Sequence, residues 1–268
     1  MQTRVGQLRY IHLFRIFFQT SIQTDMEYRA DFIARIVASL LGMATTLGSL
    51  SVVFQYTSTI RGWSLPQVVV LLAVYYLLNG LIEMFIAPNM RQIMEQVRQG
   101  TLDFVLLKPV SPQFMATFRQ VNIWRGVNVL LGLCLAVYSI RRLALHVGPM
   151  EGGAFAVTLC AGLIVVYSFW LTLVTLTFWV TRLDNLEQVM WQAFEAGRYP
   201  IDIYPAWLRG GLTYVIPVAF IITVPAQALA GKGGPLQVPI AILVAAVMLT
   251  LSTLFWRFGL KHYTGASA

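Results

Sequence analysis

Long apolar runs are the feature of this sequence that most limits its fold. A helix that crosses about 30 Å of hydrocarbon needs roughly 20 mostly apolar residues. Four runs meet that length, at about 32–56, 66–87, 153–181 and 237–258. A fifth run, about 121–141, meets it if Arg125 near its start and Arg141 and Arg142 at its end reach the bilayer interfaces.

The scarcity of charge supports the same conclusion. Only 11% of the 268 residues are charged and 57% are hydrophobic, whereas soluble domains carry about 25% charged residues. We therefore expect an all-α polytopic membrane protein, a single transmembrane domain over 1–268 whose main solvent is lipid. The net charge of +8 fits cytoplasmic loops rich in Lys and Arg. No dense basic run with interleaved aromatic residues occurs, so no nucleic-acid partner is expected.

Residues 7–24 form a separate amphipathic element. On a helical wheel one stripe is polar and another is aromatic. The polar stripe holds His12, Arg15, Gln19 and Gln23, and the aromatic stripe holds Tyr10, Phe14, Phe17 and Phe18. This pattern predicts a helix lying in the plane of the membrane interface. The alternative is an early start to the first span.

The polar insert at about 88–120 is too charged to cross a bilayer and is expected outside it. Within it, 90–99 predicts a short helix that follows Pro88 and Asn89 and ends at Gly100, a favoured residue just past a helix C-terminus. Arg91, Glu95 and Arg98 share one face of this helix, which suits contact with a charged groove on a partner. A solvated loop helix is the alternative.

The segment 184–202 is the most polar stretch among the apolar runs. Glu187, Glu195 and Arg198 fall on one side of its wheel, and each charge costs about 2.5–3.5 kcal/mol at the centre of a lipid-facing helix. The segment can therefore cross only if its polar stripe faces a protein interior or a wet cavity. Glu195 and Arg198, three residues apart, can neutralise each other.

Two topologies remain open between 182 and 236. Either 184–202 crosses and 212–230 dips into the far side and returns, or 184–202 lies on the surface and 211–230 crosses. Both give six spans, with the two termini on one side. Placing the termini inside leaves only six of the nineteen basic residues elsewhere, namely Arg61, Arg141, Arg142, Arg198, Arg209 and Lys232. The preference of Lys and Arg for the cytoplasmic side also favours a surface position for 184–202, because Arg198 and Arg209 would then lie on that side.

Motifs for catalysis and metal binding are not found in the sequence. The only Gly-Lys pair, at 231–232, is followed by Gly, so no phosphate-binding loop is present. His12, His146 and His262 are far apart and lack metal-ligand spacing. We expect no enzyme, no metal and no cofactor bound by this chain.

Four phrases in this order resemble the membrane subunits of type-2 ABC exporters, and within them a bacterial family of about this length. They are GTLDFVLLKPVSPQF (100–114), FWVTRLDNLEQ (178–188), GRYPIDIYPAWLR (197–209) and VIPVAFIITVPAQAL (215–229). The resemblance implies a six-helix permease of the inner membrane that dimerises with itself or with a sister permease. It also implies a separate ATPase subunit that binds the ATP and Mg²⁺, with both permease termini cytoplasmic.

The resemblance also assigns roles to positions. Pro205, Trp207 and Leu208 match a phrase that begins short extracytoplasmic re-entrant helices, so 212–230 becomes re-entrant and 184–202 the fifth span. The cytoplasmic insert becomes the lever that couples to the ATPase. Its candidate contacts are Arg91, Glu95, Arg98 and Asp103.

A substrate path along the dimer axis is the hypothesis for the buried polar residues. Its candidate residues are Glu83, Glu187, Gln188, Gln192, Glu195 and Arg198. In the competing interpretation, Glu83 and Glu195 are structural and pair with Arg on neighbouring helices. At the level of the whole protein, a membrane scaffold or receptor and an ion-driven secondary transporter are the alternatives to the permease.

Overall fold

The computed structural model describes residues 12–23, 29–143, 148–180 and 184–263, and these are helical almost throughout. Five of the described helical runs are long and apolar enough to cross a membrane. They are Ile36–Tyr56, Leu65–Arg98, Ile123–Arg141, Pro149–Leu176 and Gln237–His262. The expected all-α polytopic membrane fold is thereby confirmed.

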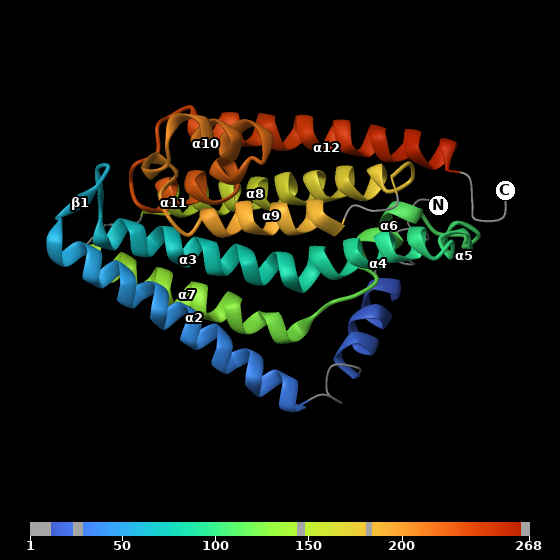
Figure 1. The fold of residues 1–268 in the computed structure, drawn as a ribbon, viewed down its shortest axis with the longest axis horizontal. Helices are drawn as coiled ribbons and strands as arrows, with labels where there is room; N and C mark the ends of the chain where they lie inside the picture. The colour runs from blue at the N-terminus through green and yellow to red at the C-terminus, as the bar shows by residue number, and fades with distance from the viewer. Residues whose placement is uncertain (1–11, 24–28, 144–147, 181–183, 264–268) are drawn as a thin grey trace.

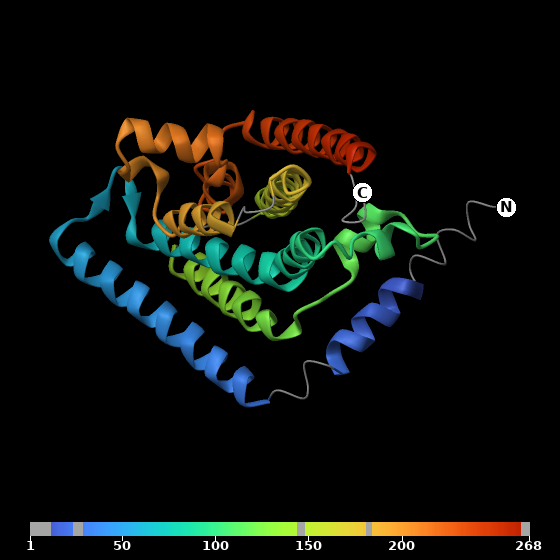
Figure 2. The same ribbon diagram turned by 45° about the vertical axis from the view of Figure 1, so that its right-hand side comes forward.

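The long helices run side by side (Figure 1). They are α2 (Arg29–Tyr56), α3 (Leu65–Leu81), α7 (Gly126–Leu143), α8 (Pro149–Leu176) and α12 (Gln237–His262). Helix α3 lies at the centre, where nearly every side chain from Val68 to Leu78 is buried. Helix α2 stands at the edge of the bundle and leaves most of its apolar side chains exposed (Figure 2).

Glycine allows α7 to pack tightly against α3. A Cβ on Gly132 would lie 2.5 Å from the backbone nitrogen of Leu77, and one on Gly80 would lie 2.6 Å from that of Val129. Both approaches involve backbone atoms, which cannot move aside as a flexible side chain can. Small residues at such contacts are typical of helix pairs in membranes, where close approach replaces the hydrophobic driving force.

Helix α3 continues without a break into α4 (Ala87–Arg98) through the π-helical turn Ile82–Ile86. Pro88 does not end the helix, because the groups that it would leave unsatisfied find other partners. The carbonyl of Met84 accepts a hydrogen bond from the backbone N–H of Asn122 at 2.9 Å. The Asn89 side chain donates to the carbonyls of Phe85 and Gln120, at 2.8 and 2.7 Å. The separate loop helix expected after Pro88 is instead the end of a longer helix.

The end of α4 follows the sequence prediction. Gly100 has a φ of +67°, the left-handed conformation that glycine favours. The N–H of Gly100 donates to the carbonyl of Val97 and that of Thr101 to the carbonyl of Gln96, which is the Schellman pattern. Two short helices follow, α5 (Asp103–Leu106) and α6 (Pro112–Phe118), before the 3-10 turn Ile123–Arg125 leads into α7.

Residues 12–23 form a helix at the same end of the bundle as α4, α5 and α6. Its predicted polar stripe is exposed, and Phe14, Phe17 and Phe18 are partly buried. Phe14 meets Phe118 edge to face at 5.9 Å between ring centroids, and Ser21 accepts a hydrogen bond from the backbone of Val121. Residues 7–11 and 24 of the predicted element, including Tyr10, lie outside the described residues.

The opposite end of the bundle carries a two-stranded hairpin, Thr59–Ile60 paired with Trp63–Ser64. Arg61 and Gly62 both have positive φ, which suits a tight two-residue turn. The indole Nε1 of Trp63 donates to Asp202 at 3.1 Å, and the Lys232 ammonium lies 4.4 Å from the centre of the Trp63 ring. These contacts join the hairpin to two later loops.

Between α8 and α12 the chain forms α9 (Asp184–Ala196) and a group of short helices. After the 3-10 turn Ile201–Ile203 come α10 (Ala206–Gly210), the π turns Gly211–Val215 and Ala219–Thr223, and α11 (Val224–Leu229). The helical runs Ala206–Val215 and Ala219–Leu229 meet at 78°, as in a broken span or a re-entrant loop. Helix α9 lies alongside α3 in both views (Figures 1 and 2).

Candidate functional site

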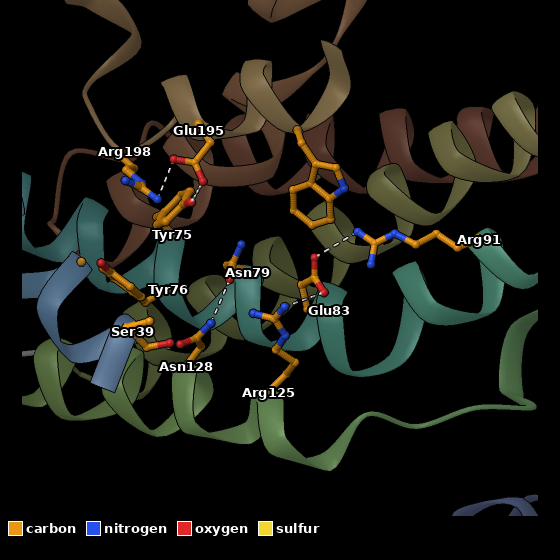
Figure 3. Close-up of a pocket in the computed structure, with 13 residues that line it drawn as sticks. Ser39, Tyr75, Tyr76, Asn79, Glu83, Arg91, Arg125, Asn128, Glu195 and Arg198 are labelled. Atoms are coloured by element: carbon orange, nitrogen blue, oxygen red, sulfur yellow. Dashed lines mark hydrogen bonds and ion pairs between the residues drawn. The ribbon is translucent and has the colours of Figure 1, made fainter. Parts of the chain in front are cut away.

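A cleft of about 510 Å³ opens between α2, α3, α9 and the start of α7 (Figure 3). Charged and polar side chains form most of one side, and small residues of α2 form the other. Its lining is Ala38, Ser39, Gly42, Tyr75, Tyr76, Asn79, Glu83, Arg91, Arg125, Asn128, Trp191, Glu195 and Arg198. A polar site of this kind inside an apolar helix bundle is expensive, and such sites are typically functional.

Glu83 occupies the π-helical turn and is only 8% exposed. One carboxylate oxygen lies 3.3 Å from Arg91 and the other 3.5 Å from Arg125. The two guanidinium groups come from α4 and from the 3-10 turn before α7, so this carboxylate links three parts of the chain. Single π turns inside α-helices often mark functional sites, because the extra residue re-aims side chains.

Arg91 extends the same network to α9. Its Nε donates to Oε1 of Glu187 at 2.6 Å, and its guanidinium lies 5.8 Å from the centre of the Trp191 ring. Arg91 is thus a charged bridge between α3, α4 and α9. Arg91 was predicted as a contact for the ATPase; in the structure its guanidinium faces two carboxylates of the same chain, and its side chain is 43% exposed.

A second charged group lies further along α9. Arg198 pairs with Glu195 at 2.6 Å, as their spacing of three residues predicts. The hydroxyl of Tyr75 donates to Glu195 at 2.8 Å, and the Arg198 guanidinium lies 4.9 Å from the centre of the Tyr75 ring. The pair is therefore held against the middle of α3.

Four buried polar atoms on side chains that line the cleft have no hydrogen-bond partner among the described residues. They are Nε of Arg125, Nε of Arg198, Oδ1 of Asn128 and Nε1 of Trp191. Asn128 is 5% exposed and uses its amide nitrogen to donate to Oδ1 of Asn79 at 3.0 Å. Buried polar atoms in native proteins are nearly always satisfied, so these four are candidates for contact with a ligand or with water.

Comparison with known sequences identifies the family. Residues 40–267 match the family described as ABC-2 family transporter protein. The chain belongs to this ABC-2 family. It is therefore a multi-pass membrane component of an ABC transporter and not itself catalytic, which confirms the resemblance seen in the four sequence phrases. No curated protein and no solved structure matches the chain.

In this ABC-2 chain, the predicted pathway residues divide into two groups. Glu83, Glu195 and Arg198 line the cleft, and Glu187 reaches it through Arg91. Gln188 and Gln192, which share the wheel face, are exposed and do not line the cleft. The pairing of Glu83 with Arg91 and Arg125 is the arrangement that the structural interpretation expects, although all three also face an open cavity.

The remaining candidate coupling residues lie near the tip of α4. Glu95 pairs with Arg98 on the exposed side, and Asp103 begins α5. Beside them Phe104 is 70% exposed and Leu107 is 82% exposed. Sequence reasoning did not single out these two, because an apolar residue in an apolar protein gives no signal until its surroundings are known.

The predicted re-entrant motif begins a short helix. Pro205 is the N-cap of α10, Trp207 is exposed, and Leu208 packs against the core. Among the described residues no group of three His, Cys, Asp or Glu could hold a metal ion.

Tyr75, Asn79, Arg125 and Asn128 are cleft residues that sequence reasoning did not assign to the site. A signal for the first two was available, since Tyr75, Asn79 and Glu83 are spaced four apart and so share one helical face. Arg125 was expected to reach a bilayer interface, but it turns toward the buried carboxylate of Glu83 instead.

Proposed function

We propose that this chain is the permease subunit of an ATP-driven exporter, working as a dimer with a separate ATPase. The observation that carries the proposal is the charged cleft beside a continuous helix, Leu65–Arg98. That helix contributes Glu83 and Arg91 to the cleft and ends beside an exposed tip at α5. It is therefore a rigid connection between a motor bound at the tip and the cleft.

The proposed orientation has the end with α4, α5 and α6 in the cytoplasm. The helix of residues 12–23 and the C-terminal end of α12 lie at that same end (Figure 1). The distribution of Lys and Arg supports this choice, because it leaves only six of nineteen basic residues elsewhere. The cell membrane is the expected location, with both termini on the cytoplasmic side.

For the fifth span we propose α9, followed by re-entrant helices α10 and α11. Glu187 contacts Arg91 near one end of the long helix, and Glu195 contacts Tyr75 near the middle of it, so α9 runs along α3. The alternative of a surface helix is harder to reconcile with these contacts. The thirteen residues of α9 span about 20 Å, which is less than the usual hydrocarbon thickness. The chain that follows α9, up to Ile203, covers the remaining distance across the membrane.

The cleft is the proposed substrate path. Its acidic and basic side chains neutralise one another while still facing a cavity, which lowers the cost of burying them. The exposed apolar face of α2, next to the cleft, is a surface on which a second permease can close the path. That second permease is either another copy of this chain or a sister subunit.

The proposed docking surface for the ATPase consists of Glu95, Arg98, Asp103, Phe104 and Leu107. It combines charge with two highly exposed apolar side chains, as interface centres often do. The ATP and Mg²⁺ would be bound by the ATPase.

Co-purification tests the proposal. Tagged chain, expressed together with a candidate ABC ATPase subunit from the same organism, should retain that subunit and show ATP hydrolysis. Phe104→Asp with Leu107→Asp should reduce the retained ATPase by about tenfold or more, because interface centres dominate affinity. Tyr56→Asp, a change at an exposed aromatic residue at the other end of the bundle, is the matched control and should have no effect.

Two outcomes would overturn the proposal. Transport that persists without any ATPase would favour an ion-driven transporter. A chain that retains no ATPase and moves no substrate would favour a scaffold or receptor.

A further inference from the structure

The charges at the cleft nearly cancel. Its lining holds three guanidinium groups, of Arg91, Arg125 and Arg198, and two carboxylates, of Glu83 and Glu195. A third carboxylate, of Glu187, lies outside the lining and pairs with Arg91. A site that selects a purely anionic or purely cationic ligand carries an excess of the opposite charge, since complementary potential gives specificity. The balance therefore favours a ligand without net charge.

The unsatisfied atoms specify what such a ligand must offer. The Nε atoms of Arg125 and Arg198 are charged donors without an acceptor among the described residues, and Oδ1 of Asn128 is an acceptor without a donor there. An anionic group on the ligand can accept hydrogen bonds from the two Nε atoms. An ammonium group that carries N–H can donate one to Oδ1 of Asn128. Tyr76 in the lining adds an aromatic face that attracts a cation, whereas the rings of Tyr75 and Trp191 already face Arg198 and Arg91.

The side of the cleft formed by α2 is different in character. It consists of Ala38, Ser39 and Gly42, whose small side chains leave space. Their neighbours Val37 and Leu41 are exposed and apolar. These residues belong to Ile36–Tyr56, a candidate membrane span, so an alkyl chain beside them would remain in hydrocarbon.

We propose that the cleft binds the head of a zwitterionic amphiphile, whose anionic group meets Arg125 and Arg198, whose ammonium meets Asn128, and whose tail lies along α2. The proposal rests on the proposed function, because it names the substrate class of the same permease. A membrane phospholipid and a soluble zwitterion share the head chemistry, and the tail distinguishes them.

Ligand binding to the purified chain, without any ATPase, tests this class directly. The intrinsic tryptophan fluorescence is a suitable readout because Trp191 lines the cleft. The probes are dihexanoylphosphatidylethanolamine, its phosphatidylglycerol analogue, hexylammonium and glycerophosphoethanolamine. The first, a zwitterion with tails, should bind about tenfold more tightly than each of the other three, because each lacks one required feature.

Variants locate the binding. Asn128→Leu removes the free acceptor and should weaken binding of the zwitterionic probe by about tenfold. Arg125→Lys keeps the positive charge beside Glu83 but lacks Nε, and it should cause a similar loss. It also decides the question if Asn128→Leu does not yield a monodisperse protein. Thr250→Val, on the exposed side of α12, is the matched control and should bind normally.

Several results would overturn the inference. Equal or tighter binding of the anionic or the cationic probe would exclude a preference for a zwitterionic head. Equal binding of glycerophosphoethanolamine would exclude a requirement for the tail. Normal binding by both Asn128→Leu and Arg125→Lys would move the site elsewhere. ATPase co-purification is independent of these measurements, so failure of the ligand class is distinguishable from failure of the permease assembly.

Discussion

The Nε of Arg91 lies 2.6 Å from Oε1 of Glu187, although the two residues are 96 positions apart in the chain. This contact joins α4, the end of the longest described helix, to α9. The same arginine lies 3.3 Å from Glu83 within its own continuous helix. Movement of α4 therefore acts directly on two walls of the cleft.

The Arg91–Glu187 pair should make a small but measurable contribution to stability. Arg91→Gln, Glu187→Gln and the double variant form a double-mutant cycle, read from thermal unfolding in detergent. The Arg91 side chain is 43% exposed, so solvent screening limits the expected coupling to about 1 kcal/mol. The more exposed pair Glu95 and Arg98 is the control, and its coupling should be near zero. Equal coupling in the two pairs would contradict the assignment of Arg91 to a structural bridge.

Glu195 and Arg198 should behave as a unit. Neutralising one partner leaves the other as an uncompensated charge in the bundle, so Glu195→Gln and Arg198→Gln should each lower protein abundance. The double variant leaves no charge and should recover much of that abundance. Quantitative immunoblotting of membranes measures this effect.

Transport per molecule then separates a structural role of this pair from a pathway role. If the recovered double variant transports normally, the pair is structural and the pathway role is lost. If it is abundant but transports poorly, the pair belongs to the path.

The contact between α3 and α7 should not tolerate added bulk. Gly132→Ala and Gly80→Ala each place a methyl group against backbone, and overpacking of this kind costs about 1–3 kcal/mol. Gly126→Ala is the matched control, because nothing lies within 4 Å of its added Cβ. Thermal unfolding midpoints should fall for the first two variants only. An unchanged midpoint for Gly132→Ala would mean that the helices separate easily.

Thiol labelling should establish the orientation of the chain. In a background with Cys134→Ala and Cys160→Ala, a cysteine at Arg61 should react with an impermeant maleimide on intact cells. A cysteine at Arg98 should react only after the membrane is opened. The reverse pattern would invert the proposed topology.

The same labelling tests the fifth span. Gln192→Cys lies on the exposed side of α9. If α9 crosses the membrane, this position faces lipid or a second subunit and should react slowly from both sides. Rapid labelling from the cytoplasmic side would instead indicate a surface helix.

The features that the sequence predicted well are those set by local pattern. The length of the apolar runs follows from bilayer thickness, and the amphipathic stripe of 12–23 emerges with its polar residues exposed. The Glu195–Arg198 pair follows from helical spacing, and the left-handed Gly100 follows from backbone sterics. Each depends on residues within one or two turns of one another.

The features that the sequence could not predict depend on neighbours distant in the chain. Pro88 is a strong stop signal locally, but Asn122 and Asn89 satisfy the carbonyls around it and the helix continues. The partner of Arg125 was likewise hidden, because Glu83 is reached only after α3 and α7 have packed. Such compensation comes from tertiary contacts, which no local pattern encodes.

The π-helical turn at Ile82–Ile86 has a consequence for variation in chain length. A π turn holds one residue more than an α turn, so a single deletion there could restore regular α-helix. Because the wide turn absorbs its extra residue, α4 would keep its orientation relative to Tyr75 and Asn79, and Arg91 would still face Glu187. A deletion in the regular helix on either side would instead rotate one part against the other by about 100°. In homologous chains, a loss of one residue from Leu65–Arg98 should therefore fall at this turn.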